Sequence, residues 1–250
     1  MNPTGKTALV TGGAVRVGKA ITLALARAGA NVVINYNSSS QAADETAAAA
    51  RALGVQALAI QADIADRAQV EALARRAERE LGGVDILVNS ASLFQATPFP
   101  TADHSGWERV TGIGIDGPYY LTNAIAPGML KKGEGAIVNI VDLSAWEPWP
   151  DFIAHSVSKA ALMAMTRQWA LELAPAVRVN AVAPGPVLPP PDYTAKHIER
   201  VRERTLLERW GSPEDVAEAV LYFVRAGYVT GDILFIDGGE RFGHRKRGDD

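Results

Sequence analysis

Seven short apolar runs, alternating with longer Ala-rich stretches, constrain the fold of this chain more than any other feature. The runs are continuous rather than alternating, which is typical of strands in a parallel sheet covered on both faces. Such alternation implies right-handed crossovers and a doubly wound α/β fold, whose ligands bind beyond the carboxyl ends of the strands. The predicted strands are 7–10, 31–35, 55–60, 85–89, 136–141, 177–182 and 232–237, and the predicted helices are 17–28, 40–53, 66–80, 105–131, 155–173 and 213–225.

Length, charge and residue usage limit the classes of function. A chain of 250 residues with 48% hydrophobic residues is expected to form one domain over residues 1–242, with a charged tail over 243–250. The net charge of −3 gives no general attraction to nucleic acid or to a membrane surface. Cys is absent and the four His are scattered, so no metal site is predicted. The first strand begins too early to leave room for a signal peptide, so we expect a cytoplasmic protein.

The segment TGGAVRVGKA (11–20) lies between the first predicted strand and a helix. A Gly-rich turn at this place lets backbone N–H groups approach a pyrophosphate, with the positive end of the helix dipole behind them. Arg16 adds to this, because a cation in the first turn of a helix opposes the dipole, and a bound anion would remove the conflict. The alternative is a solvated surface Arg.

The loop after the second strand, NYNSSS (35–40), bears on the choice of nicotinamide cofactor. An NAD site typically presents Asp or Glu there to the ribose 2′-hydroxyl, and that charge would repel the 2′-phosphate of NADP. Here the first acidic residue is Asp44, already inside the next helix. Neutral groups at Asn35, Asn37, Ser38 and Ser39 favour NADP, although they also suit a helix N-cap.

Several ordered motifs make the chain resemble the short-chain dehydrogenase/reductase family over essentially its whole length. They are TGGAVRVG (11–18), Asp63 in QADIAD, NSAS (89–92), SVSKAAL with Lys159, NAVAPGP (180–186) and TGDILFIDGG (230–239). The resemblance implies a Rossmann-type doubly wound parallel sheet of about seven strands, an NADP(H) cofactor and a homotetramer built on helices 105–131 and 155–173 and the last strand. It implies cofactor binding by Gly12, Arg16, Val17, Gly18, Asn35, Tyr36, Asn37, Ser38, Asp63, Ile64, Asn89, Ser90, Ala91, Lys159, Pro184 and Gly185.

The chain looks most like the pteridine reductase branch, in which Arg replaces the middle Gly of the cofactor loop. In that branch the Arg contacts both cofactor and pterin, and Arg16 fits the pattern. A Ser and a Phe after the fourth strand bind the bicyclic ring, and Ser92 and Phe94 stand at those places. The branch also has Asp in place of the family's catalytic Ser, and Asp142 matches it.

Two catalytic positions depart from the family. His155 stands where the family has Tyr, four residues before Lys159, and Gly114 stands where an Asn assists a water relay. The predicted catalytic residues are therefore Asp142, His155 and Lys159, with Lys159 on the ribose, His155 orienting the substrate, and Asp142 or water supplying the proton. Alternatively, Asp142 caps a turn and His155 is a helix-start residue in a hydrogen-bonded pocket.

We therefore expect an NADPH-dependent reductase that acts on a small molecule, either pterin-like or another planar carbonyl or imine compound. Arg16, Ser92, Phe94, Asp142 and His155 are the predicted substrate-binding residues, with the Pro-rich segment 183–193 as the substrate loop and Trp146 and Trp149 nearby. A second hypothesis is a regulatory or scaffold protein that binds the nucleotide but has lost efficient turnover, since fold alone does not imply activity.

Overall fold

A single parallel sheet of seven strands forms the centre of the molecule in the computed structural model, which describes residues 1–190 and 193–245. The strand order is β3-β2-β1-β4-β5-β6-β7, so the chain reverses direction across the sheet between β1 and β4. This confirms the predicted Rossmann-type fold. The strands are β1 Thr7–Val10, β2 Asn31–Tyr36, β3 Ala57–Gln61, β4 Ile86–Asn89, β5 Gly135–Ile140, β6 Val177–Pro184 and β7 Ile233–Ile236.

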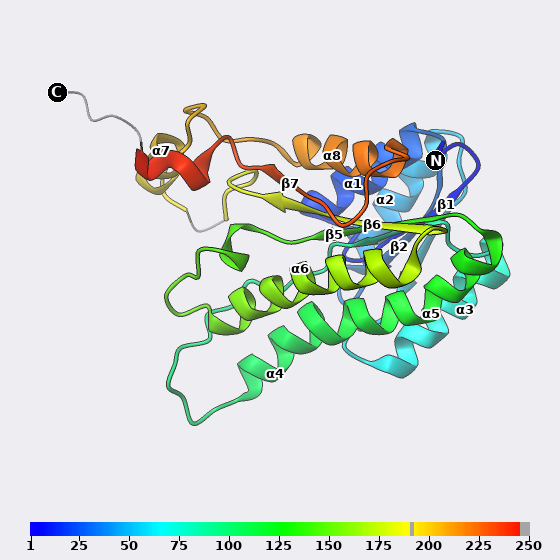
Figure 1. Ribbon diagram of the computed structural model, residues 1–250, viewed down its shortest axis with the longest axis horizontal. Helices are drawn as coiled ribbons and strands as arrows, with labels where there is room; N and C mark the ends of the chain where they lie inside the picture. Colours follow the sequence, from blue (N-terminus) through cyan, green and yellow to red (C-terminus); the bar gives the residue numbers. More distant parts are fainter. Residues whose placement is uncertain (191–192, 246–250) are drawn as a thin grey trace.

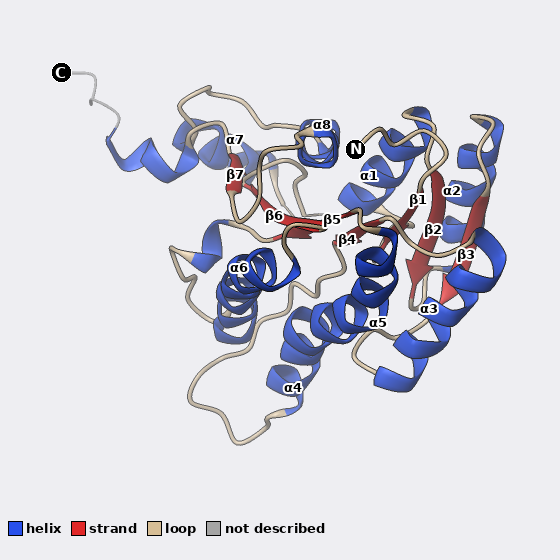
Figure 2. Cartoon of the chain, turned by 45° about the vertical axis from the view of Figure 1, so that its right-hand side comes forward, coloured by secondary structure: helices blue, strands red, loops and turns tan. Residues whose placement is uncertain are grey.

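Helices cover both faces of the sheet (Figures 1 and 2). One face carries α1, α2 and α8, and the other carries α3 to α6. The α-helices are α1 Arg16–Arg27, α2 Ser40–Ala52, α3 Arg67–Leu81, α4 Ser105–Thr111, α5 Gly117–Lys132, α6 Ile153–Leu173, α7 Ala195–Arg204 and α8 Pro213–Arg225. Two 3-10 helices, η2 Leu143–Ala145 and η3 Glu240–Arg245, follow β5 and β7, and a π-helical segment, η1 Gly112–Asp116, joins α4 to α5.

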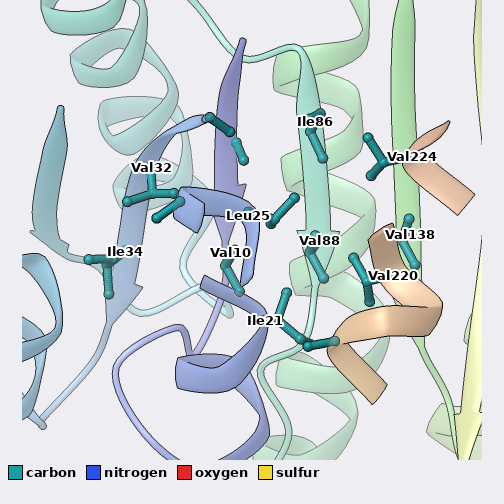
Figure 3. Close-up of a cluster of buried hydrophobic side chains, with 14 of the residues drawn as sticks. Val10, Ile21, Leu25, Val32, Ile34, Ile86, Val88, Val138, Val220 and Val224 are labelled. Atoms are coloured by element: carbon teal, nitrogen blue, oxygen red, sulfur yellow. The ribbon is translucent and has the colours of Figure 1, made fainter. Parts of the chain in front are cut away.

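Burial of strand side chains on both faces explains the continuous apolar runs of the sequence. Figure 3 shows the larger core cluster, in which Ile21 and Leu25 of α1 and Val220 and Val224 of α8 pack on the strands. All four of these side chains are fully buried. Each buried aliphatic side chain of this size stabilises the fold by about 1.5–3 kcal/mol relative to its exposed state.

Local capping explains where several helices begin and end. Asp66 accepts hydrogen bonds from the backbone N–H groups of Ala68 and Gln69 and so caps α3, while Ser212 and Asp215 form a reciprocal capping box at α8. The αL conformation of Gly82 ends α3. These ends lie within a residue or two of the predicted ones.

The predicted helix 105–131 is confirmed as helical throughout, over α4, η1 and α5, but its geometry changes to π-helical in the segment Gly112–Asp116. Three Gly residues occur in or beside this segment, Gly112, Gly114 and Gly117, and each lies against a neighbouring side chain. The predicted tail 243–250 begins inside η3, and residues 246–250 of that tail lie outside the described residues. Residues 191 and 192 of the predicted substrate loop also lie outside them.

Candidate active site

The loops that follow the strands gather at one edge of the sheet, on the left in Figure 1. The segment 142–152 after β5 and the segment after β6 lie there, together with η3 and the turn that leads into α6. Every predicted site residue lies at the carboxyl end of a strand, in one of these loops or in the first turns of the helices after them.

In the loop after β1 and the first turn of α1, two glycines leave the backbone without a side chain. Gly12 has a φ of +61°, and a Cβ on it would lie 3.1 Å from Cα of Ala91. A Cβ on Gly18 would collide with the carbonyl oxygen of Gly12. A turn without side chains at the start of a helix is what a pyrophosphate needs in order to approach backbone N–H groups, so the residues present fit a dinucleotide.

Arg16 begins α1 with a φ of +50°, in the left-handed region that favours Gly. Its side chain is exposed, and Nη2 lies 3.5 Å from the carbonyl oxygen of Leu188, at the long end of a hydrogen bond. The guanidinium thus reaches from the cofactor loop to the predicted substrate loop.

The predicted cofactor residues at the end of β2 and directly after it differ in their exposure to solvent. Asn35 is buried, and its amide donates to the carbonyl oxygen of Ala62 at 3.0 Å, so this side chain connects β2 to the loop after β3. Tyr36 is half-buried, and Asn37 and Ser38 are exposed and free to meet a ligand from solvent.

Most of the remaining predicted cofactor residues lie at the ends of β4 and β6 or in the loops after β3, β4 and β6. The N–H groups of Ser90 and Ala91 both donate to Oγ1 of Thr11 at 2.9 Å, a contact that sequence reasoning missed. Asn89 donates to Oδ1 of Asn139 at 2.8 Å, while its own Oδ1 is buried with no partner among the described residues. Such an acceptor is consistent with a ligand or water that donates to it. Val17 and Gly185 are half-buried, Ile64 and Pro184 are buried, and Asp63 is paired with Arg109.

Asp142, His155 and Lys159 come together after β5 and in the first turns of α6. Nε2 of His155 lies 2.7 Å from Oδ2 of Asp142, and Oδ1 of Asp142 accepts from the backbone N–H and the hydroxyl of Ser144. Nζ of Lys159 donates to the carbonyl oxygen of Ile140 at 2.8 Å. His155 and Lys159 are 4% and 6% exposed, so both polar groups are removed from bulk water.

The electrostatics of the three residues are coupled. Burial lowers the pKa of Lys159, and the charge of Asp142 offsets part of that effect. Burial by itself would raise the pKa of Asp142, but the hydrogen bond from His155, the charges of Lys159 and His155 and the Ser144 hydroxyl together hold that pKa below its ordinary value. The lowered pKa favours the ionised carboxylate, and the predicted role of Asp142 as a proton source stays a prediction.

His155 uses both ring nitrogens within the protein. Nε2 faces Asp142, and Nδ1 lies 3.4 Å from the carbonyl oxygen of Leu93 in the loop after β4. Both partners are acceptors, and the contact of Nδ1 is at the long end of a hydrogen bond. His155 thus joins α6 to the loops after β4 and β5, and its predicted role in orienting the substrate stays a prediction.

An aromatic cluster lies beside His155. Phe94 stacks on Phe152, with ring centroids 4.3 Å apart, and meets His155 edge-on at 5.2 Å. Trp149 is parallel to the His155 ring at 6.0 Å. Phe94 is nonetheless 54% exposed, and Ser92 is exposed nearby. Sequence reasoning missed Phe152, whose only signal was its place just before α6, and Trp146 packs instead on Phe235.

Gly114 is in tight contact with α6. A Cβ at Gly114 would lie 2.6 Å from Cβ of Ser158, whose hydroxyl donates to the carbonyl oxygen of Ala154. The Asn that the family has at this position therefore cannot be placed here without moving η1 away from α6.

Other kinds of site are not apparent in the part of the chain that the structure describes. No group of three or more potential metal ligands occurs among residues 1–190 and 193–245. A groove of about 390 Å³ between α3 and α5, lined by residues such as Ala74, Val84 and Lys132, contains none of the predicted site residues. Within the described ranges, no helix has the length and apolarity required to cross a membrane.

Known proteins resemble the chain over nearly its whole length. Residues 13–240 match the family model described as enoyl-(acyl carrier protein) reductase. A 3β-hydroxysteroid dehydrogenase 1 from Eggerthella lenta is 37% identical over 94% of this chain and 93% of its own length, and a 3-oxoacyl-[acyl-carrier-protein] reductase from Synechocystis is 35% identical over 94% and 97%. The structure of FolM alternative dihydrofolate reductase 1 from Brucella canis, complexed with NADP, superposes with a TM-score of 0.88 at 34% identity, covering 99% of this chain and 98% of that one.

Proposed function

This chain belongs to the short-chain dehydrogenase/reductase family, and from that premise we propose that it is an NADPH-dependent reductase of a pterin-like or other planar carbonyl or imine substrate. The observation that carries the proposal is Arg16. It occupies a left-handed backbone position suited to Gly, and its guanidinium reaches Leu188 in the segment after β6. One cation can thus serve both a cofactor phosphate and a substrate. The structural similarity to an alternative dihydrofolate reductase bound to NADP supports this assignment.

The cofactor would lie across the carboxyl ends of the strands. The bare turn at Gly12 and Gly18 would hold its pyrophosphate, and Asn37 and Ser38 would meet the ribose phosphate with neutral donors. When bound, NADPH supplies the hydride, and the protein supplies binding, orientation and electrostatics.

Among Asp142, His155 and Lys159, we assign the role of proton donor to the substrate to Nζ of Lys159. Its pKa is lowered by burial, so the buried ammonium releases a proton more readily than an ordinary Lys. Asp142 stays ionised and balances the charge of Lys159. His155 is a positioning residue, because its two nitrogens hold Asp142 and Leu93 in place.

Phe94 would provide the platform for a flat substrate. Its ring is more than half exposed, and Phe152 stacks on one face of it. The ring is therefore held in one orientation and is pre-organised for stacking with a ligand. The exposed Ser92 lies two residues away and can donate or accept a hydrogen bond at the edge of the ligand.

The test combines turnover with binding. NADPH oxidation is followed with a panel of pterins and small carbonyl compounds, and Kd is measured for NADPH and for the best planar ligand. We expect Phe94→Ala to weaken the planar ligand by about 1–3 kcal/mol, from lost contact area and stacking. The Kd of NADPH should hardly change.

Phe99→Ala is the matched control, since Phe99 lies in the same loop, is 77% exposed and is not part of the aromatic cluster described above. It should leave both affinities unchanged. Equal effects of the two substitutions, or no saturable binding of any planar heteroaromatic compound, would contradict the planar-substrate proposal.

A second function is favoured by two observations: both nitrogens of His155 have partners within the protein, and Gly114 packs directly on Ser158. A nucleotide-binding protein without efficient turnover would have this arrangement. Tight NADPH binding with no turnover across the whole panel would select it over the reductase.

A further inference from the structure

Thr97 lies in the loop between β4 and α4, shortly after Phe94, and is buried. Its backbone N–H donates to the carbonyl oxygen of Asp151 at 2.6 Å, and its hydroxyl accepts from the backbone N–H of Ala154 at 3.1 Å. It also forms an isolated parallel bridge with Phe152. Thr97 therefore binds the start of α6 through both its backbone and its side chain.

The hydroxyl of Thr97 replaces a side-chain cap that α6 lacks. The first N–H groups of an α-helix have no partner within the helix, and a hydroxyl or carboxylate at the N-cap normally accepts from one of them. The N-cap of α6 is Phe152, which makes no side-chain capping bond. Oγ1 of Thr97 accepts instead from Ala154, in the first turn of α6, across a separation of 57 residues. The start of α6 is thus held by a different loop of the chain.

The turn before α6 has a strained backbone where it meets Thr97. Asp151 has a φ of +64°, in the left-handed region that non-Gly residues rarely adopt. Such a conformation persists only where the surrounding structure holds it, and the N–H of Thr97 binds its carbonyl oxygen. The methyl group of Thr97 also faces α4, since a Cβ on Gly106 would lie 3.3 Å from Cγ2 of Thr97. Thr97 thus connects its loop to both α4 and α6.

The two segments that meet at Thr97 carry the two parts of the aromatic cluster. Phe94 belongs to the loop after β4, whereas Phe152 and His155 belong to the start of α6. The carbonyl oxygen of Leu93, directly before Phe94, lies 3.4 Å from Nδ1 of His155, and Thr97 binds α6 further along the same loop. The stacked rings of Phe94 and Phe152 therefore lie between two contacts that join these segments.

We propose that Thr97 is a positioning residue of the substrate site: its hydroxyl holds the start of α6 against the loop that carries Phe94. Thr97 acts on a planar ligand through the stacked rings of Phe94 and Phe152. Loss of the hydroxyl therefore weakens that ligand and leaves the binding of NADPH unchanged. The inference rests on the proposed function, because it takes the aromatic cluster as the platform for the substrate.

The test compares Thr97→Val, which keeps the shape of the side chain but has no hydroxyl, with Thr97→Ser, which keeps the hydroxyl. Fluorescence titration gives the Kd of pterin and the Kd of NADPH for each protein. Thr97→Val is expected to weaken pterin about fivefold, as for the loss of one hydrogen bond, with the Kd of NADPH hardly changed. Thr97→Ser should retain the wild-type value for both.

Thr122→Val is the matched control. Thr122 of α5 is also buried, but its hydroxyl has no hydrogen-bond partner among the described residues. Removing that hydroxyl should leave both Kd values unchanged.

A second measurement needs no ligand. The imidazole N–H resonances of His155, assigned by their absence in His155→Phe, are recorded by NMR on protein with labelled His. Thr97→Val should shift or broaden them, because the first turn of α6 is less firmly held, whereas Thr97→Ser and Thr122→Val should leave them as in wild type. Thermal melting shows whether each variant folds, and Thr97→Ala, which leaves room for a water molecule at Ala154, takes the place of Thr97→Val if the latter does not fold.

A folded Thr97→Val protein with unchanged resonances of His155 would overturn the inference. Equal losses of pterin and NADPH affinity, or a Thr97→Ser protein that behaves like Thr97→Val, would also overturn it. A wild-type protein that binds NADPH but no pterin would instead refute the proposed substrate, and the resonances of His155 would still decide whether Thr97 positions the start of α6.

Discussion

At the scale of single residues, Arg16 shows a conflict between backbone and side chain. A left-handed conformation costs a non-Gly residue about 1–2 kcal/mol, and a cation at a helix N-terminus opposes the helix dipole. Gly at this position would have neither cost. Both costs are consistent with a side chain that binds an anion. The same reasoning applies to Lys159, whose burial without a carboxylate hydrogen-bond partner is unfavourable for a structural Lys.

Arg16→Gly is therefore expected to raise the free energy of unfolding by up to about 1 kcal/mol, as relief of strain outweighs the added chain entropy of Gly. The same substitution should weaken NADPH by about tenfold through the loss of a charge-assisted hydrogen bond. Urea denaturation and a binding titration measure the two effects. Arg16→Lys keeps both the strain and the charge and should change neither value as much; a destabilised Arg16→Gly protein would rule out the strain argument.

At the scale of elements, the close contact between η1 and α6 limits which side chains can stand at the η1 positions that face α6. Gly114 lets the backbone of η1 lie against Ser158, one residue before Lys159. A π-helical segment at this place fits its frequent occurrence at functional sites. The two helical segments are thus closer than an Asn at position 114 would permit.

Gly114→Ala is expected to destabilise the protein by about 1–3 kcal/mol, because the new Cβ would overlap Cβ of Ser158. Adding Ser158→Gly should remove most of that loss beyond its own cost as a helix Gly. Gly128→Ala in α5 is the control: no atom lies within 4 Å of a Cβ there, so it should stabilise the helix by about 0.5–1 kcal/mol. Thermal or urea unfolding measures all three, and a neutral Gly114→Ala would show that η1 can shift away from α6 at little cost.

At the scale of the whole molecule, α5 and α6 leave large apolar side chains in water. Leu171 and Val157 of α6 are 74% and 40% exposed and are about four helical turns apart, so they lie on one face. Tyr119 and Leu130 of α5 are 52% and 44% exposed. Such faces suit the proposed homotetramer, in which the long helices of neighbouring copies cover one another.

Leu171→Asp is expected to lower the molecular mass measured by light scattering after gel filtration, because a charge would be buried in the proposed interface. Tyr228→Asp is the control, since Tyr228 lies in a loop, is fully exposed and is outside both helices. A wild-type protein that elutes as a monomer, or a Leu171→Asp protein with unchanged mass, would argue against this face as the interface.

The sequence by itself determined the sheet, the helices around it and the edge at which the predicted site residues gather. Strand and helix periodicity, helix caps and the Gly-rich turn are local signals, because each depends on residues only a few positions apart. The helix predicted over 105–131 is helical throughout, but its π-helical segment Gly112–Asp116, where Gly114 lies against Ser158 of α6, was not predicted. Periodicity carries no information on such a contact.

Only the tertiary structure decided which side chains meet. His155 lies 13 residues from Asp142 and 62 from Leu93, and Arg109 lies 46 residues from Asp63, yet each pair is within contact distance. These contacts decided that the pKa of Asp142 is lowered, that the His155 ring lies between Asp142 and Leu93, and that Phe94 stacks on Phe152. The physical reason is that protonation and orientation depend on burial and on partners brought together by the fold, and neither quantity is encoded in the spacing of residues along the chain.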